Sequence, residues 1–278
     1  MLQESRYKNG KTQVSYRHNF LSKKRETIIF LHGFPDGPSV WDGIGELLDK
    51  EFNLIIPYLP GVHSDCEIED RLSERFFLSL LLLLEKELGP SSPVHLVGHD
   101  VGGVLADQLS FILGSRCQSV TFISTMGLNL YSQNLKIDQI IKSWYVPLFS
   151  TKIGQRVMGR SNRYSKLLLK KIDSTTPDHQ IPNRLGSIKF YQEFTKRLYR
   201  KSDSGRINNT KSLFLFSTND PFVQIPSKDL INKLYPNSTV RVLKGGHWEF
   251  CHRSEYFCRL IREGIKGERE EEYEYLQI

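Results

Sequence analysis

Three residues of the types used in nucleophilic catalysis, two aspartates and a histidine, each follow an apolar stretch of the sequence. Asp100 is the centre of the turn GHDVG at residues 98–102, after the run SPVHLV. Asp220 comes 120 residues later, after SLFLFSTN, and His247 a further 27 residues on, after TVRVLKGG. A nucleophile on a glycine-flanked turn, then an acid, then a histidine are the parts of a catalytic triad. The sequence therefore predicts that these three residues act together.

The aspartate at the nucleophile position determines which chemistry is expected. Its carboxylate would attack an electrophilic saturated carbon and become an alkyl ester. Water activated by His247 would then hydrolyse that ester at the carbonyl carbon of Asp100, while Asp220 orients the imidazole. A simple helix N-cap is the alternative interpretation of Asp100. The presence of Asp220 and His247 in the required order favours the catalytic interpretation.

Near-continuous apolar runs predict the strands that position these residues. A hairpin around Asn9-Gly10 comes first, and six runs follow that are typical of strands covered on both faces, as in a parallel sheet. The runs span residues 26–34, 52–61, 92–100, 119–125, 212–220 and 239–247. The helical stretches between them span residues 41–50, 72–88, 103–113, 228–234 and 255–266. We expect an α/β fold with a mostly parallel, eight-stranded sheet flanked by helices.

Residues 127–210 interrupt this alternation, because they show helical periodicity, tyrosines and basic groups but no convincing strand. So long a loop is uncommon in a compact domain. We therefore predict a helical cap inserted at 127–210 into a core domain formed by residues 1–126 and 211–278. Residues 141–211 hold 16 Lys or Arg against 4 Asp or Glu. A solvated basic face is the favoured interpretation, and a weak peripheral membrane contact through the cap stays open.

The remaining composition limits the class of protein. The formal net charge is +7, but no nucleic-acid motif accompanies it, so no nucleic-acid partner is expected. The polar start MLQESRYKNGKTQ lacks a signal-peptide pattern, and the nine-residue run FFLSLLLLL is too short to span a membrane and predicts a buried helix segment. The four cysteines form no C-x-x-C pair, which argues against a zinc site or a disulfide framework. We expect a cytoplasmic protein that uses no metal or cofactor.

These motifs resemble those of the α/β-hydrolase family. The turn GHDVG is similar to its nucleophile elbow, and LHGFPDG at residues 31–37 is similar to the His-Gly turn after its first core strand. The resemblance implies an oxyanion hole made by the backbone N–H groups of Phe34 and Val101. Four further residues are expected to contact the substrate: His32, Pro35, Trp144 and Trp248.

Within this family, the aspartate nucleophile resembles that of epoxide hydrolases and haloalkane dehalogenases, whose substrates carry a leaving group on saturated carbon. Epoxide hydrolases place two tyrosines over the nucleophile, one in an aromatic-rich early part of the cap and one on a later cap helix. The stretch KSWYVPLF offers Tyr145 for the first position, and SIKFYQEF offers Tyr191 for the second. Their hydroxyl groups would protonate the departing epoxide oxygen. Aromatic packing is the alternative interpretation of both tyrosines.

The residues beside the nucleophile argue against a halide as the leaving group. Haloalkane dehalogenases usually hold the halide with a tryptophan directly after the nucleophile and with an Asn in a His-Gly-Asn-Pro turn, where this sequence has Val101 and Phe34. Fluoroacetate dehalogenases grip the substrate with arginines one and four residues after the nucleophile, where this sequence has Val101 and Val104. Many epoxide hydrolases also carry a tryptophan at the position of Val101, so the substrate itself stays open.

The leading hypothesis is an epoxide hydrolase that adds water to a small apolar epoxide and forms a vicinal diol through an ester on Asp100. A haloalkane dehalogenase-like hydrolase is the alternative enzyme. A non-catalytic binding protein on a hydrolase scaffold is the alternative outside catalysis, and the complete triad argues against it. A monomer and a homodimer are both compatible with the sequence.

Overall fold

The computed structural model describes the regions expected to form the core domain and small parts of the predicted cap. The described residues are 2–10, 12–19, 21–60, 62, 72–134, 167, 205–267 and 275–276. Most of the interval 127–210 lies outside them. The division of the chain into a core domain and a cap therefore stays a prediction.

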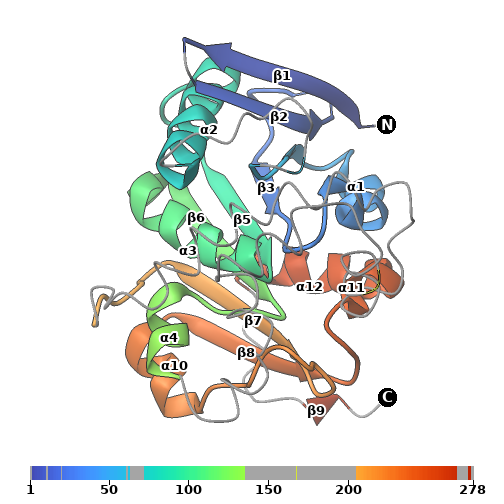
Figure 1. Ribbon diagram of the computed structural model, residues 1–278, viewed down its shortest axis with the longest axis vertical. Helices are drawn as coiled ribbons and strands as arrows, with labels where there is room; N and C mark the ends of the chain where they lie inside the picture. Colours follow the sequence, from blue (N-terminus) through green and yellow to red (C-terminus); the bar gives the residue numbers. More distant parts are fainter. Residues whose placement is uncertain are drawn as a thin grey trace.

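A mixed sheet of nine strands runs through the described structure in the order β1-β2-β4-β3-β5-β6-β7-β8-β9 (Figure 1). Its strands are β1 Gln3–Asn9, β2 Thr12–His18, β3 Thr27–Leu31, β4 Asn53–Pro57, β5 Val94–His99, β6 Cys117–Ile123, β7 Lys211–Ser217, β8 Ser238–Leu243 and β9 Tyr275–Leu276. β1 and β2 form the expected antiparallel hairpin, and β2 is also antiparallel to β4. All other neighbouring strands are parallel.

All eight expected strands are present, which confirms the mostly parallel α/β sheet. The ninth strand, β9, is an addition to that prediction. It has two residues and pairs with Val242 and Leu243 at the end of β8. Local sequence does not predict it, because the surrounding acidic stretch GEREEEYEYLQI contains no apolar run.

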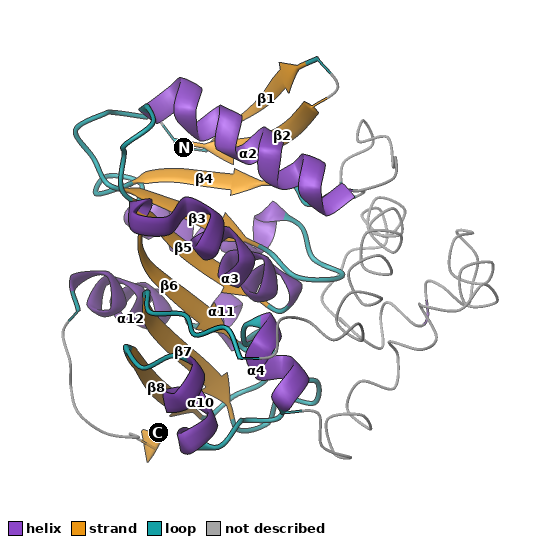
Figure 2. Ribbon diagram, turned by 90° about the vertical axis from the view of Figure 1, so that its left-hand side faces the viewer, coloured by secondary structure: helices purple, strands orange, loops and turns teal. Residues whose placement is uncertain are grey.

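Helices cover both faces of the sheet (Figure 2). One face carries α2 Leu72–Leu88, α3 Val101–Leu113, α4 Leu128–Gln133 and α10 Lys228–Leu234. The other face carries the 3-10 helix η1 Pro38–Trp41, α1 Asp42–Leu48, α11 Glu249–His252 and α12 Ser254–Lys266. A second 3-10 helix, η2 Gly114–Arg116, connects α3 to β6. No helix among the described residues is long and apolar enough to cross a membrane.

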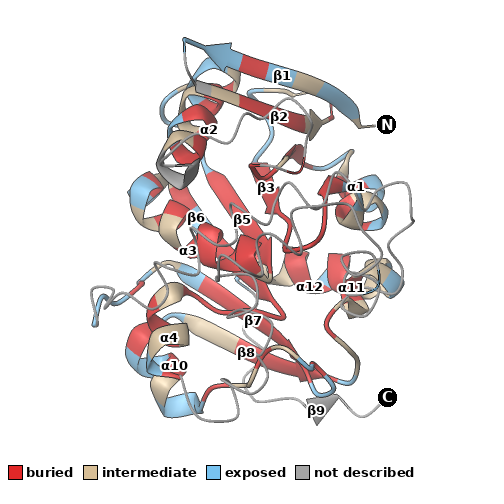
Figure 3. Cartoon of the chain, viewed as in Figure 1, coloured by how far each residue is buried: buried red, intermediate tan, exposed pale blue. Residues whose placement is uncertain are grey.

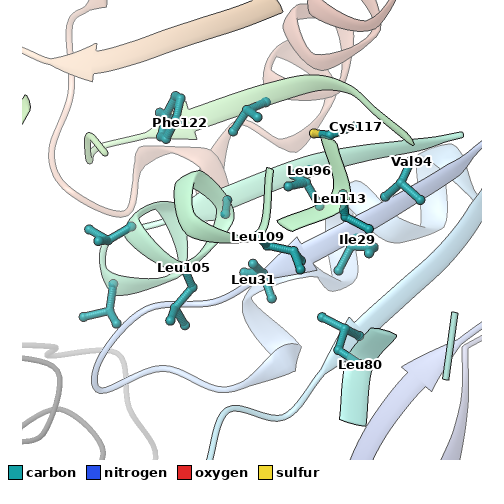
Figure 4. Packing of buried hydrophobic residues seen from close by; sticks show 14 of the residues in the cluster. Ile29, Leu31, Leu80, Val94, Leu96, Leu105, Leu109, Leu113, Cys117 and Phe122 are labelled. Carbon is teal, nitrogen blue, oxygen red and sulfur yellow. The ribbon is translucent and has the colours of Figure 1, made fainter. Parts of the chain in front are cut away.

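The strands at the centre of the sheet are buried because helices cover both of their faces (Figure 3). Every residue of β3, β4 and β5 is buried, as the near-continuous apolar runs predict. Leu105 and Leu109 of α3 belong to one buried cluster with Ile29 of β3 and Leu96 of β5 (Figure 4). The apolar run at residues 76–84 lies within α2, and most of its side chains join the same cluster, as expected. This packing holds the start of α3 against the sheet.

The segments that follow the neighbouring strands β3 and β5 go to opposite faces of the sheet. β3 leads into η1 and α1 on one face, whereas β5 leads into α3 on the other face. In open α/β sheets, ligands bind at the carboxyl ends of the strands at such a switch point. Asp100 directly follows β5 and therefore lies at this position.

The buried carboxylate of Asp107 on α3 joins both ends of the predicted cap to the core. It accepts hydrogen bonds from the Leu128 N–H at 3.2 Å, from Asn208 Nδ2 at 2.9 Å and from the Tyr235 hydroxyl at 2.8 Å. Burial raises the pKa of Asp107, although these three donors oppose the shift. Leu128 begins α4 and Asn208 lies shortly before β7. One side chain thus holds both ends of the predicted cap against α3.

Asp107→Ala is expected to lower the free energy of unfolding by about 3 kcal/mol or more, because three donors, two of them in buried hydrogen bonds, lose this acceptor. Urea denaturation measures the change. Glu46→Ala removes an exposed carboxylate of α1 and is the control, with an expected change below about 0.5 kcal/mol. Similar small changes in both variants would contradict the role of Asp107.

Candidate active site

Asp100 occupies a strained turn between β5 and α3. Its φ of 51° and ψ of −124° lie outside the regions that residues with a side chain usually adopt. Glycines on both sides allow the turn. A Cβ at Gly98 would lie 2.5 Å from the carbonyl oxygen of Gly102, and a Cβ at Gly102 would overlap the carbonyl oxygen of Leu31. The turn therefore has the geometry of a nucleophile elbow.

The carboxylate of Asp100 is directed to the end of β3 and does not cap its own helix. Asp100 is the N-cap residue of α3, but its side chain makes no capping hydrogen bond. Its Oδ1 instead accepts a hydrogen bond from the backbone N–H of Phe34 at 3.0 Å. Gly33 permits this approach, since a Cβ there would lie 2.6 Å from Asp100 Cβ. These contacts do not support the alternative of a simple helix cap.

His247 lies between the two aspartates. Its Nδ1 is 2.8 Å from Asp220 Oδ2, and its Nε2 is 3.6 Å from Asp100 Oδ2. Asp220 Oδ1 accepts hydrogen bonds from the N–H groups of Phe222 and Val223, at 2.8 and 3.0 Å. Three residues that lie far apart in the sequence thus adopt the arrangement of a nucleophile, a base and an orienting acid.

The two carboxylates control the protonation of His247. Burial by itself lowers the pKa of His247, but the charges and hydrogen bonds of Asp220 and Asp100 outweigh burial and raise the pKa to about 10. Burial also acts to raise the pKa of Asp220. His247 and the two backbone N–H groups nevertheless hold the pKa of Asp220 below its usual range. At neutral pH the free site therefore favours a protonated His247 between two carboxylates.

Aromatic rings surround the imidazole of His247. The ring centroids of Phe222, Trp248 and His99 lie 5.0, 4.8 and 4.5 Å from it. The indole N–H of Trp248 donates to Asp36, whose two carboxylate oxygens are both 3.1 Å away. Because this N–H is engaged by Asp36, Trp248 contributes its apolar ring to the surroundings of His247.

Three other residues expected at the site lie in the two turns beside Asp100. Val101 is the first residue of α3 and is buried. Pro35 is also buried, and the peptide bond before it is cis. His32 is fully buried, with Nδ1 2.9 Å from the Gly33 carbonyl oxygen and Nε2 3.1 Å from the Leu59 N–H. These main-chain bonds occupy His32 within the protein and give no support to its expected contact with the substrate.

The remaining expected site residues, Trp144, Tyr145 and Tyr191, lie outside the described residues. Their positions relative to Asp100 and to the substrate stay predictions. Over the part of the chain that is described, no group of three His, Cys, Asp or Glu side chains is arranged to hold a metal ion.

Four further residues, which the sequence motifs do not indicate as functional, contact the candidate triad or its neighbours. Thr125 donates through Oγ1 to the backbone carbonyl of Asp100 at 2.6 Å and so supports the elbow. Its position just after β6 was a signal that could have identified it. Asp36 and His99 lie inside the two motifs that were recognised, but their types alone did not indicate a role. Phe222 gave no signal, because an aromatic residue after a turn is common.

The fold and the site define a class of protein, an α/β scaffold on which Asp100, Asp220 and His247 follow three strands of one sheet, β5, β7 and β8. The family model described as the alpha/beta hydrolase fold matches residues 26–251. The chain belongs to the α/β-hydrolase family.

Distant relatives of different names share parts of this sequence. The chain is 24% identical over 251 residues to "Probable oxidoreductase EphD" of Mycobacterium tuberculosis, and the match covers 80% of this chain and 42% of that protein. The chain thus spans less than half the length of that relative. It is 23% identical over 255 residues to the monoacylglycerol lipase ABHD6 of Mus musculus, covering 85% of this chain and 74% of the lipase.

Several solved structures share the fold. The epoxide hydrolase of Bacillus megaterium, solved with an inhibitor, matches with a TM-score of 0.73 at 17% identity, covering 94% of this chain and 100% of that chain. The Cif epoxide hydrolase of Acinetobacter nosocomialis matches with a TM-score of 0.75 at 16% identity, covering 95% and 88%. At these identities the similarity shows the fold alone.

The raised pKa of His247 predicts a pH-dependent contribution to stability. Protonated His247 is stabilised only in the folded protein. Its contribution to the free energy of unfolding is therefore complete at pH values below the pKa of this histidine in the unfolded protein, and it is lost as the pH rises toward about 10. The difference in free energy of unfolding between the wild type and His247→Gln should fall by more than about 1 kcal/mol between about pH 6 and pH 10. Urea denaturation at a series of pH values measures it. A difference that grows with pH would contradict the raised pKa.

Proposed function

We propose that this protein is an epoxide hydrolase, which adds water to a small apolar epoxide and releases a vicinal diol. One observation carries the proposal. The carboxylate of Asp100 lies on a strained elbow, with Oδ1 3.0 Å from the Phe34 N–H and Oδ2 3.6 Å from His247 Nε2. A carboxylate nucleophile in this position suits attack at a saturated carbon. The shared fold with two epoxide hydrolases agrees with this assignment.

In the first step an oxygen of Asp100 attacks one carbon of the epoxide ring. A bond forms between this carbon and Asp100, the ring carbon–oxygen bond breaks, and the released oxygen takes up one proton. The proposed donors are Tyr145 and Tyr191 of the predicted cap at 127–210. His247 is the proposed source of the replacement proton, because the raised pKa favours its protonated form in the free site.

In the second step the ester on Asp100 is hydrolysed. Ester formation removes the negative charge of Asp100, which is part of what raises the pKa of His247. The neutral imidazole then accepts a proton from water, and the resulting hydroxide attacks the carbonyl carbon of Asp100. The N–H groups of Phe34 and Val101 stabilise the negative oxygen that forms. The bond between the carbonyl carbon of Asp100 and the diol oxygen then breaks, and this oxygen takes up the proton of the new carboxyl group. The diol leaves, the carboxylate of Asp100 and protonated His247 are restored, and each turnover consumes one water.

The side chains beside Asp100 support an epoxide rather than a halide. A departing halide needs N–H donors, but the side chains of Val101 and Phe34 have none, and the indole N–H of Trp248 is engaged by Asp36. A departing epoxide oxygen needs a proton, which a phenol is able to supply.

The proposed reaction balances with water alone, so no cofactor is part of the proposal. We also propose a cytoplasmic monomer or homodimer. A weak peripheral contact between the basic residues of 141–211 and an anionic membrane stays open, and any such contact should weaken as the salt concentration rises.

His247→Gln is expected to stop the reaction after the first step, because Asp100 still attacks the epoxide while the base for hydrolysis is missing. The variant is mixed with a panel of aliphatic, aryl and fatty-acid epoxides. Mass spectrometry should then detect a mass increase equal to one epoxide, on the peptide that contains Asp100. His252→Gln changes an exposed histidine of α11 and is the matched control. It should turn over like the wild type, without trapped mass.

Single turnover in water labelled with heavy oxygen tests the same route in the wild type. Hydrolysis at the carbonyl carbon places the first label on Asp100, and the diol becomes labelled only in later turnovers. A labelled diol from the first turnover, with an unlabelled Asp100 peptide, would rule out the covalent route. Halide release from short alkyl halides at a higher rate than diol formation would favour the dehalogenase alternative. Neither trapped mass nor any product would favour a binding protein.

A further inference from the structure

A second buried histidine–carboxylate pair lies directly behind the candidate triad. His99 Nδ1 is 3.3 Å from Asp36 Oδ2, and both side chains are 0% exposed. The other ring nitrogen, His99 Nε2, is 3.0 Å from the backbone carbonyl oxygen of His247. The rings of His99 and His247 are 4.5 Å apart. The proposed reaction does not use this pair.

The pair links three segments that lie far apart in the sequence. Asp36 belongs to the turn after β3 that contains the Phe34 N–H. His99 ends β5 and directly precedes the nucleophile. Two hydrogen-bonded contacts hold the segment that follows β8. His99 binds the backbone carbonyl of His247, and Asp36 accepts from the indole N–H of Trp248. The oxyanion turn, the elbow and the segment of the base therefore meet at one buried contact.

One hydrogen bond orients the His99 ring. The carbonyl oxygen of His247 only accepts, so His99 Nε2 donates to it. On the other side of the ring, Nδ1 lies 3.3 Å from Asp36 Oδ2, at the distance of an ion pair but without the geometry of a hydrogen bond. The ring of His99 therefore lies between Asp36 and the backbone carbonyl of His247.

We propose that Asp36 and His99 form a positioning pair for hydrolysis of the ester on Asp100, an inference that rests on the proposed function. Hydrolysis needs both the His247 imidazole and the Phe34 N–H, and the pair connects the segments that carry them. The first step needs mainly the carboxylate of Asp100 in its elbow, which Gly98, Gly102 and Thr125 already support. The pair therefore acts on the second step more than on the first.

Two variants separate this role from simple stabilisation. Asp36→Asn keeps the shape of the side chain and removes its charge. His99→Gln keeps a donor for the His247 carbonyl but has no ring nitrogen that faces Asp36. In both variants the rate of ester hydrolysis should fall at least about tenfold, because a small misplacement of a catalytic group slows the step that uses it. The rate of alkylation should fall less than about threefold. Rapid-quench single turnover with an epoxide from the panel measures both rates, and the ester should accumulate as a detectable mass.

His95→Gln is the matched control. His95 lies on the same strand as His99 and is 3% exposed. Its Nδ1 is 2.8 Å from Ser119 Oγ, and its Nε2 is 3.7 Å from Glu26 Oε1. It is therefore another buried histidine beside a carboxylate, but it lies near the start of β5, at the other end from Asp100. We expect this variant to lose stability without changing the ratio of the two rates.

The outcomes distinguish the positioning role from the proposed function. Equal reductions of both rates, or no reduction, in Asp36→Asn and His99→Gln would overturn the positioning role, provided that His247→Gln still traps the ester. Failure of His247→Gln to trap any ester would overturn the proposed function itself. Nitrogen NMR of the histidine side chains in the wild-type protein tests the proposal without a substrate, and it does not depend on whether a variant folds. A hydrogen on His99 Nε2 is expected, and its absence would overturn the proposal.

Discussion

The close approach of two backbone segments places Asp100 beside the turn that follows β3. Gly102 at the start of α3 packs against the carbonyl of Leu31 at the end of β3, and the contact leaves no room for a side chain. As a result, Asp100 comes within 3.0 Å of the Phe34 N–H. The unusual backbone of Asp100 costs about 1–3 kcal/mol. Buried strands and helices on both sides maintain it, since close-packed interiors yield little.

Interactions between the imidazole of His247 and two carboxylates link the three candidate catalytic residues. His247 is buried, and burial alone disfavours its charged form, but the carboxylates of Asp220 and Asp100 reverse that preference. The low local dielectric that makes burial costly also strengthens these attractions. In the proposed reaction, alkylation of Asp100 removes one of the two charges, so the same site would hold a proton before the first step and accept one in the second.

Buried carboxylates outside the triad lie where distant segments of the chain meet. Asp107 joins the start of α4, the residues before β7 and Tyr235. Asp36 joins the turn after β3 to His99 and to Trp248. A buried carboxyl group is tolerated only when hydrogen-bond partners surround it, and such partners are present only after the segments have assembled. Both carboxylates therefore make the geometry around Asp100 dependent on the complete fold.

Local patterns in the sequence are sufficient to predict the sheet, the elbow and the order of Asp100, Asp220 and His247, because apolar runs and glycine spacing are visible without the fold. They do not reveal β9, whose two residues are held by pairing with β8. Nor do they reveal that His99 meets Asp36 and that His32 is occupied by main-chain bonds. Only the tertiary structure decided these partners. They come from neighbouring strands such as β3 and β5, whose pairing brings together residues that no local pattern relates.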